Sequence, residues 1–277
     1  MPDHGNRKQS GYRRPGSRRG RGYRRPVLRT SGRIAALVLF MLFALRYQDV
    51  NRILRQWLRG PSVIEMNPPG DSFSSPTAVS DPESIPPYEG DICVELNENR
   101  PCFTTYDLDH MEGAHYSELD ALGRCGIAWA RLDNSMMPAQ ERGEIDSVHP
   151  SGWQQVRYPD IVPFDPPFLY QRCHLIAYSL TGENANEKNL ITGTCSLNMD
   201  GMRPYEVQTA RFLDGSDDHV LYRVTPYFRG SELVPRGVEM EAWSVEDEGT
   251  GVCFHVFIYN VQPGIEIDYQ TGYSRAA

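Results

Sequence analysis

Four polar side chains in the segment 171–206 could together carry out a hydrolysis. His174 ends an apolar, strand-like stretch, and Asn189, Asn198 and Glu206 follow it within 32 residues. Neutral imidazole, whose unperturbed pKa is about 6.5, can deprotonate a water molecule near neutral pH. An amide oxygen can hold a Mg²⁺ ion that keeps most of its waters, and a carboxylate can hold one of those waters or bind the ion. These are the parts needed to hydrolyse a phosphodiester with one divalent ion.

Strands and a helix must bring these residues together. A histidine that follows a strand is more often structural than catalytic, so the case for His174 depends on the order strand, loop, strand, helix that this segment predicts. Residues 205–213 should form the helix, which Pro204 could open at its first position. In that order His174 and Asn198 can face each other across a small cleft.

The rest of the chain predicts a sheet around this segment. Apolar, β-branched and aromatic residues alternate or run together in four expected strands, at 126–132, 220–226, 233–244 and 252–261. The last two are joined by a turn-rich connection, as in an antiparallel hairpin. A further helix is expected at 116–122, and residues 133–167 should form a long loop that carries binding surface. We therefore expect an α+β fold with a mainly antiparallel sheet.

Charge is divided unevenly along the 277 residues. Residues 1–60 carry 15 Lys and Arg against two acidic residues, whereas by difference residues 61–277 carry 13 basic and 34 acidic side chains, a net charge of −21. Residues 1–33 have too little apolar surface to offset the entropy of ordering, and we expect a disordered basic tail. Non-specific binding of nucleic acid depends on neutralising phosphates. Because residues 61–277 are so acidic, we expect them to bind nucleic acid weakly, through its backbone, and with the help of a metal ion.

The N-terminal part also carries a membrane-targeting pattern. The twelve apolar residues 34–45 are fewer than the roughly 20 of a spanning helix and match the core of a signal peptide, but no small-residue cleavage site follows them. We favour a short uncleaved transmembrane anchor at 34–46, with a cleaved signal and a soluble core helix as alternatives. The excess of arginine before the apolar run predicts a cytoplasmic N-terminus and an extracellular body.

Three segments complete the predicted organisation. Residues 47–60 should form an amphipathic helix at the outer lipid interface or continue the anchor helix. Residues 61–90, with seven prolines and six serines, should be an extended linker, and residues 91–277 the folded domain. The six cysteines show no zinc-binding pattern. Cys93 and Cys102 are the pair close enough in sequence to suggest a local disulfide.

Several motifs of the domain resemble those of the DNA/RNA non-specific endonucleases, the ββα-metal or His-Me finger nucleases, and specifically the bacterial DNA-entry type. They are LGRCGIAWARL at 122–132, PSGWQ at 150–154, YQRCHLIAYSLTGENANEKNLITGT at 170–194, LNMDGMRPYE at 197–206 and IYNVQPG at 258–264. The resemblance covers nearly all of the domain. It implies that the sheet carries an inserted ββα-metal motif and that the chain is an Mg²⁺-dependent endonuclease, with Mn²⁺ as a substitute ion. The substrate it implies is DNA, with RNA left open.

The resemblance also implies roles for the four polar residues. His174 would be the general base and Asn198 the metal ligand. Glu206 would bind the ion or a metal-bound water. Asn189 would orient the site by hydrogen bonding, its alternative being an asparagine that caps a turn.

Two positions depart from the family motif, and neither replaces the base or the ligand. Gln171 stands where many members have an acid, and Cys173 stands where glycine is usual. The motif can therefore still be active.

An arginine is also needed to stabilise charge on the reacting phosphate. Arg131 ends one expected strand, and Arg172 neighbours the base, although strand alternation argues against it. For both arginines a surface ion pair is the ordinary alternative. Arg131, Arg203 and Trp153 are the candidate substrate-binding residues.

Two other functions stay open on sequence alone. One is a membrane-anchored nucleic-acid-binding or structural protein on a catalytically dead nuclease fold, which the intact His174, Asn198 and Glu206 argue against. The other is a secreted antibacterial toxin, which nothing in the chain favours. No obligate protein partner is evident from the sequence.

Overall fold

A computed structural model describes residues 85–277. The predicted tail, anchor, juxtamembrane helix and most of the linker lie outside these residues. Within 85–277, no helix is both long enough and apolar enough to cross a membrane.

The domain is built on a six-stranded sheet in which all neighbouring strands are antiparallel. Its strand order is β1 (Cys93–Glu95), β8 (Cys253–Tyr259), β7 (Gly237–Ser244), β6 (Val220–Tyr227), β3 (Ala128–Leu132) and β2 (Ala114–Tyr116). Two antiparallel pairs stand apart from this sheet: β4 (Tyr170–His174) with β5 (Leu190–Thr194), and β9 (Ile265–Ile267) with β10 (Ser274–Ala276).

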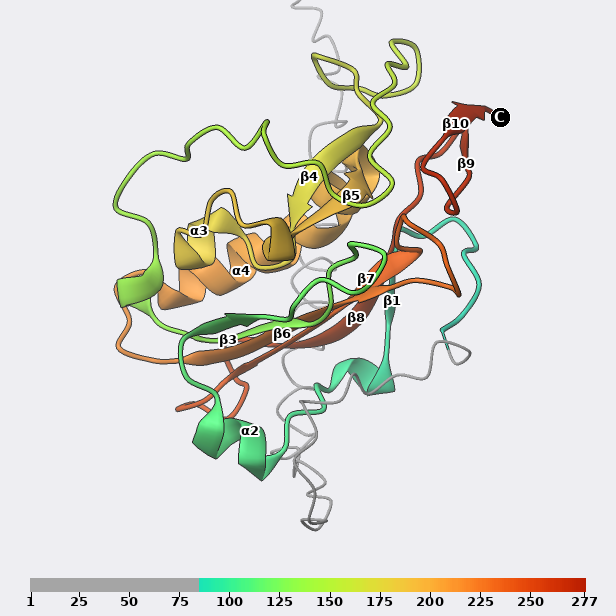
Figure 1. The fold of residues 1–277 in the computed structure, drawn as a ribbon. Helices are drawn as coiled ribbons and strands as arrows, with labels where there is room; N and C mark the ends of the chain where they lie inside the picture. Colours follow the sequence, from blue (N-terminus) through green and yellow to red (C-terminus); the bar gives the residue numbers. More distant parts are fainter. Residues whose placement is uncertain (1–84) are drawn as a thin grey trace, which may run out of the picture. The chain divides into compact units, whose positions relative to one another are not determined.

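Helices are short except for one. They are α2 (Thr105–His110), α3 (Tyr178–Thr181) and α4 (Arg203–Leu213), with single turns η2 (Asn97–Asn99), η3 (Asn134–Met136) and η4 (Glu187–Asn189). A π-helical segment, η5 (Leu197–Met202), runs directly into α4. Figure 1 shows α3, α4 and the β4–β5 pair on one face of the six-stranded sheet and α2 on the other.

Strand alternation divides the sheet into these two faces. On β3, Ala128, Ala130 and Leu132 are buried in the main core, which also contains residues of β4, α3, η5 and α4. Trp129 lies on the opposite face, against a cluster that includes Phe103 and Trp243. Because successive side chains of a strand point to opposite faces, Arg131 belongs with Trp129.

The η5–α4 unit lies close against the sheet because of one glycine. A Cβ placed on Gly201 would lie 2.2 Å from Cγ2 of Ile258 on β8. Leu197 and Met202 on either side of it are buried in the main core. This close packing fixes where the side chains of η5 and of the first turn of α4 lie relative to the β4–β5 pair.

The predicted α+β fold with a mainly antiparallel sheet and a strand, loop, strand, helix segment is confirmed. The expected hairpin of residues 233–244 and 252–261 is β7–β8, although β7 starts only at Gly237. Pro235 lacks the N–H that a strand ladder needs. The helix expected at 205–213 is α4, and it begins two residues earlier.

Two expectations were wrong. The helix at 116–122 is absent, since Tyr116 ends β2 and the Asp120 carboxylate accepts hydrogen bonds from the backbone N–H groups of Leu122 and Arg124, which makes a turn. The Cys93–Cys102 disulfide is also absent, because all six cysteines are free.

Cys93 and Cys102 are separated by the sheet. The Cys93 sulfur lies 3.2 Å from the Tyr205 hydroxyl of α4. The Cys102 sulfur lies 3.8 Å from Nδ1 of His255, whose side chain is on the α2 face. The two cysteines are close in sequence but too far apart in the fold to form a disulfide.

Candidate active site

The β4–β5 pair and the turn that follows it position His174. His174 is the last residue of β4 and pairs with Leu190 of β5. The fully buried Asn189 fixes the chain immediately after it: its Oδ1 accepts from the Ile176 N–H and its Nδ2 donates to the Ile176 carbonyl, both at 2.9 Å. Asn189 thus contacts the backbone that leaves His174, an arrangement that suits an orienting residue.

The imidazole of His174 is held in one tautomer. Its Nε2 lies 2.8 Å from the Asn184 carbonyl oxygen, which can only accept, so Nε2 carries the proton. Its Nδ1 lies 3.3 Å from Nη2 of Arg142 and therefore presents a lone pair on that side. Burial of the ring, which is 6% exposed, lowers its pKa to about 4; the Asn184 carbonyl opposes this and the charge of Arg142 adds to it. The ring is therefore neutral at neutral pH, and Nδ1 is the nitrogen that can accept a proton.

Arg142, which the sequence does not single out, contacts the candidate base His174. It belongs to the long loop 133–167, which is tied down on both sides of the arginine. The Tyr178 hydroxyl of α3 donates to the Gln140 carbonyl at 2.9 Å, and Asn184 Nδ2 donates to the Glu144 carbonyl at 3.2 Å. The length of this loop is the sequence feature that predicts binding residues in it, although it does not identify Arg142.

Asn198, in η5, has its amide oriented by a short chain of hydrogen bonds. Asn198 Nδ2 donates to Gln171 Oε1 at 2.5 Å, and Gln171 Nε2 lies 3.3 Å from the Cys195 sulfur. Within residues 85–277, Asn198 Oδ1 has no hydrogen-bond partner. The amide nitrogen is thus occupied while the oxygen is left for a cation, which is the orientation that a metal ligand needs.

Glu206 stands in the first turn of α4 and is half-buried. Its carboxyl group has no hydrogen-bond partner in the described part of the chain. Burial raises its pKa to about 7, while the positive charges of Arg142 and Arg203 lower it. A divalent ion nearby would act in the same direction as these arginines and favour the carboxylate. Arg142 thus interacts electrostatically with both Glu206 and His174.

Arg172 lies close to His174 but is engaged elsewhere. The two residues are two apart in β4 and so point to the same side, contrary to the expectation from strand alternation. However, the Arg172 guanidinium donates to the Val148 carbonyl at 2.6 Å and to the Asp146 carboxylate at 3.0 Å. It also stacks on Trp153, 4.4 Å from the ring centroid. Arg172 and Trp153 together hold the loop 146–153 against β4.

The structure does not bring Arg131 to the site. Arg131 lies on the α2 face of the sheet, where its Nη1 donates to the Leu108 carbonyl at 2.8 Å. Arg203, by contrast, is exposed at the start of α4 and near enough to Glu206 to affect its pKa. Of the predicted cationic residues, Arg203 is therefore the one left free to meet a substrate.

The donor set suits a hard divalent cation such as Mg²⁺. The Asn198 amide oxygen and the Glu206 carboxylate are oxygen donors without protein partners among the described residues, and such ions prefer oxygen. A cavity of about 300 Å³ lies elsewhere, lined by Tyr227, Phe257 and Tyr259 among others, and none of the site residues borders it. The candidate residues His174, Asn198 and Glu206 lie instead on β4, η5 and α4.

Comparison with known proteins supports the fold and the class of enzyme. The model of the DNA/RNA non-specific endonuclease family matches residues 104–246. NucA from Streptococcus agalactiae with magnesium ion bound is 28% identical, with a TM-score of 0.57, over 66% of this chain and 86% of that one. The metal-free NucA structure is 29% identical with a TM-score of 0.56 over the same shares. Sda1 nuclease with bound zinc ion is 29% identical with a TM-score of 0.52, over 60% of this chain and 83% of that one.

Proposed function

Since the chain belongs to the DNA/RNA non-specific endonuclease family, whose members hydrolyse phosphodiester bonds, we propose that it is a Mg²⁺-dependent nuclease that cuts DNA outside the cell. The observation that carries this proposal is the state of His174. Its Nε2–H is fixed by a carbonyl and its Nδ1 lone pair faces Arg142. That is the arrangement of a general base next to a group that can bind a phosphate.

The residues of the site divide the reaction between them. Nδ1 of His174 accepts the proton of the attacking water, while the Asn184 carbonyl stabilises the imidazolium that forms. Arg142 neutralises charge that grows on the phosphate oxygens. Asn198 would hold the divalent ion, and Glu206 would hold the ion or one of its waters. When bound, the ion neutralises charge on the phosphate and on the leaving oxygen.

Magnesium as the ion is supported by the donor set and by the related NucA, whose structure has a magnesium ion bound. Mn²⁺ has the same preference for oxygen ligands and is the expected substitute. The zinc ion in Sda1 nuclease shows that a relative's structure also accepts another divalent ion. A metal series therefore belongs in the functional assay.

The substrate is proposed to be bound through its backbone and without base readout. A body of net charge −21 in residues 61–277 offers no broad basic surface, so the ion, Arg142 and Arg203 must neutralise the phosphates locally. The extracellular location rests on the basic and apolar pattern of residues 1–46. A catalytically dead binding protein is the alternative, and the unpaired oxygens of Asn198 and Glu206 argue against it.

The metal requirement is tested with the purified full chain on plasmid DNA and on RNA. We expect EDTA to abolish cutting and Mg²⁺ or Mn²⁺ to restore it. Asn198→Ala should lower activity at limiting Mg²⁺ by at least about 100-fold, because it removes the protein's oxygen ligand. Asn134→Ala, at an exposed asparagine of η3, is the matched control and should cut normally. Undiminished cutting in EDTA, or by Asn198→Ala, would overturn the proposal.

The hydrogen bond from Asn198 to Gln171 gives a second prediction. Gln171→Ala frees the Asn198 amide to rotate, and we expect the Mg²⁺ concentration for half-maximal activity to rise about 10- to 100-fold. The rate at saturating Mg²⁺ should change much less. Mg²⁺ affinity is measured in parallel by calorimetry, and circular dichroism checks folding. An unchanged Mg²⁺ requirement in Gln171→Ala would show that the amide is held by other means.

A further inference from the structure

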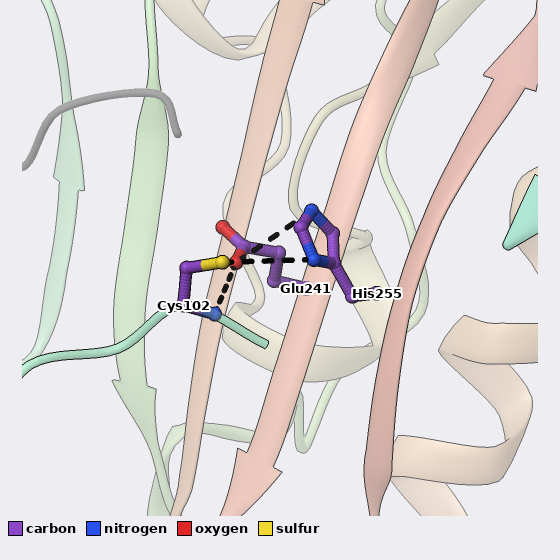
Figure 2. Close-up of side chains that lie close together, drawn as sticks. All are labelled: Cys102, Glu241 and His255. Atoms are coloured by element: carbon purple, nitrogen blue, oxygen red, sulfur yellow. Dashed lines mark hydrogen bonds and ion pairs between the residues drawn. The ribbon is translucent and has the colours of Figure 1, made fainter. Parts of the chain in front are cut away.

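Three side chains with metal-binding atoms converge on the opposite face of the sheet from His174. We propose that Cys102, Glu241 and His255 form a second, structural metal site that binds Zn²⁺. One ligating atom from each of the three lies within 4.8 Å of the others. Figure 2 shows the Cys102 sulfur, the Glu241 carboxylate and the His255 ring pointing toward one another.

The backbone holds these residues in place from three segments. Glu241 of β7 and His255 of β8 are direct cross-strand partners, with side chains only 2% and 1% exposed. Cys102 comes from the segment between η2 and α2, and its N–H donates to Glu241 Oε1 at 2.7 Å. The Cys102 sulfur lies 3.8 Å from His255 Nδ1. A tetrahedral zinc ion with Zn–S of about 2.3 Å and Zn–N of about 2.0 Å requires roughly 3.5 Å between sulfur and nitrogen, so these two atoms are already close to the required separation.

Neighbouring groups orient the ligands as they do in zinc sites. His255 Nε2 lies 2.6 Å from Glu239 Oε1, which turns Nδ1 toward Cys102. A metal-bound histidine usually donates its other N–H to a carboxylate in this way. Arg223 binds Glu241 Oε2 through Nε at 2.7 Å and Nη2 at 2.6 Å. Glu241 Oε1 accepts from the Cys102 N–H and lies 3.8 Å from His255 Nε2.

A fourth possible ligand atom, a backbone oxygen, lies beside Nδ1 of His255. The Arg100 carbonyl is 2.9 Å from His255 Nδ1, which donates its proton to this oxygen when no metal is bound. Glu239 Oε1 accepts from Nε2 and the Arg100 carbonyl accepts from Nδ1, so both ring nitrogens of His255 carry protons. The cluster thus already holds a cation, the Nδ1 proton. Zn²⁺ would replace this proton and the thiol proton, releasing two protons as the Zn–N and Zn–S bonds form.

A strained loop holds that carbonyl in position. Asn97, Glu98 and Asn99 have φ values of 45°, 56° and 61°, a left-handed run that non-glycine residues rarely adopt. Asn99 Oδ1 accepts from the His255 N–H at 2.9 Å, which fastens the loop to β8. A left-handed backbone conformation of this kind persists only where the surrounding structure fixes it. Here the loop 97–99 brings Arg100 and Cys102 to the cluster.

The ligand types favour zinc over the ion proposed for the nuclease site. Thiolate and imidazole are ligands for Zn²⁺, whereas Mg²⁺ takes oxygen. A zinc ion here would join the segment 100–102 to β7 and β8 and stabilise the sheet, without taking part in phosphodiester hydrolysis.

Cobalt substitution tests the site directly. The purified full chain is stripped with a chelator and titrated with Co²⁺, and we expect an intense near-ultraviolet thiolate-to-cobalt band that saturates at one equivalent. Cys102→Ser should lose the band and bind Zn²⁺ at least about 100-fold more weakly. Cys253→Ser is the matched control, because Cys253 is half-buried on the same strand as His255, and it should keep the band.

The result of the cobalt titration does not depend on whether the proposed nuclease activity is correct. Asn198→Ala should keep the cobalt band, and Zn²⁺ should raise the unfolding temperature of the wild-type chain and of Cys253→Ser but not of Cys102→Ser. A missing band, or one that Cys102→Ser retains, would overturn the metal site and leave a buried ion-pair network of His255, Glu239, Glu241 and Arg223. If the same preparation still cuts DNA in a Mg²⁺-dependent way, the proposed nuclease function is unaffected by that result.

Discussion

Replacing His174 by alanine should reduce cutting of plasmid DNA by about 10²- to 10⁴-fold, the usual contribution of a general base. The tautomer is fixed by the Asn184 carbonyl, so Nδ1 is the atom that the reaction loses. No other imidazole among the described residues contacts Arg142, and the substitution should therefore not be compensated. Nicking is measured with saturating Mg²⁺, so that the effect on the base is separated from metal binding.

The control for this variant is another histidine. His110 is exposed at the end of α2, and its Nδ1 contacts only the Tyr106 carbonyl of its own helix. His110→Ala should cut at the wild-type rate. Small added imidazoles should partly restore His174→Ala, since the substitution leaves a space in the pocket. A His174→Ala protein that is folded and cuts at the wild-type rate would exclude histidine as the base.

Much of the framework was predictable because it is set by local patterns. Alternating apolar residues identified β3, β6 and β8, and Pro204 marked the start of α4. The order strand, loop, strand, helix placed His174 and Asn198 in the elements that the structure shows. These predictions need only the periodicity of side chains along one element.

The errors concern relations between elements. Alternation shows that Arg131 and Leu132 point to opposite faces of β3, but it does not say which face receives α4. Arg131 was therefore placed at the site although it contacts α2. Cys93 and Cys102 were considered a pair for a similar reason, since the sheet that separates them is formed by strands distant in sequence.

Arg142 escaped prediction for a different reason. It lies in a loop without periodicity, and its position depends on two hydrogen bonds that tie this loop to Tyr178 and Asn184. Neither bond has a sequence signature. A loop of this length could be expected to carry binding residues, but which of its side chains reaches His174 is decided by tertiary contacts.

Arg142 should therefore matter far more to catalysis than Arg131. We expect Arg142→Ala to lower kcat by about 10²- to 10³-fold, the usual effect of losing one group that stabilises transition-state charge. Arg131→Ala should leave kcat near the wild-type value. It removes one hydrogen bond to the Leu108 carbonyl on the far face, worth about 1 kcal/mol of stability. Both rates are measured with the same plasmid at a temperature where both variants are folded.

Arg142→Lys distinguishes phosphate binding from a merely structural role. Lysine keeps the positive charge but lacks the planar, five-donor fork that can grip two phosphate oxygens, so its rate should fall between those of wild type and Arg142→Ala. If Arg142 only fixed the loop over His174, Arg142→Lys and Arg142→Ala would be equally impaired and both would unfold earlier. If instead Arg131→Ala had the larger effect on kcat, the substrate would have to reach the α2 face, and the site described around His174 could not be the one that cuts.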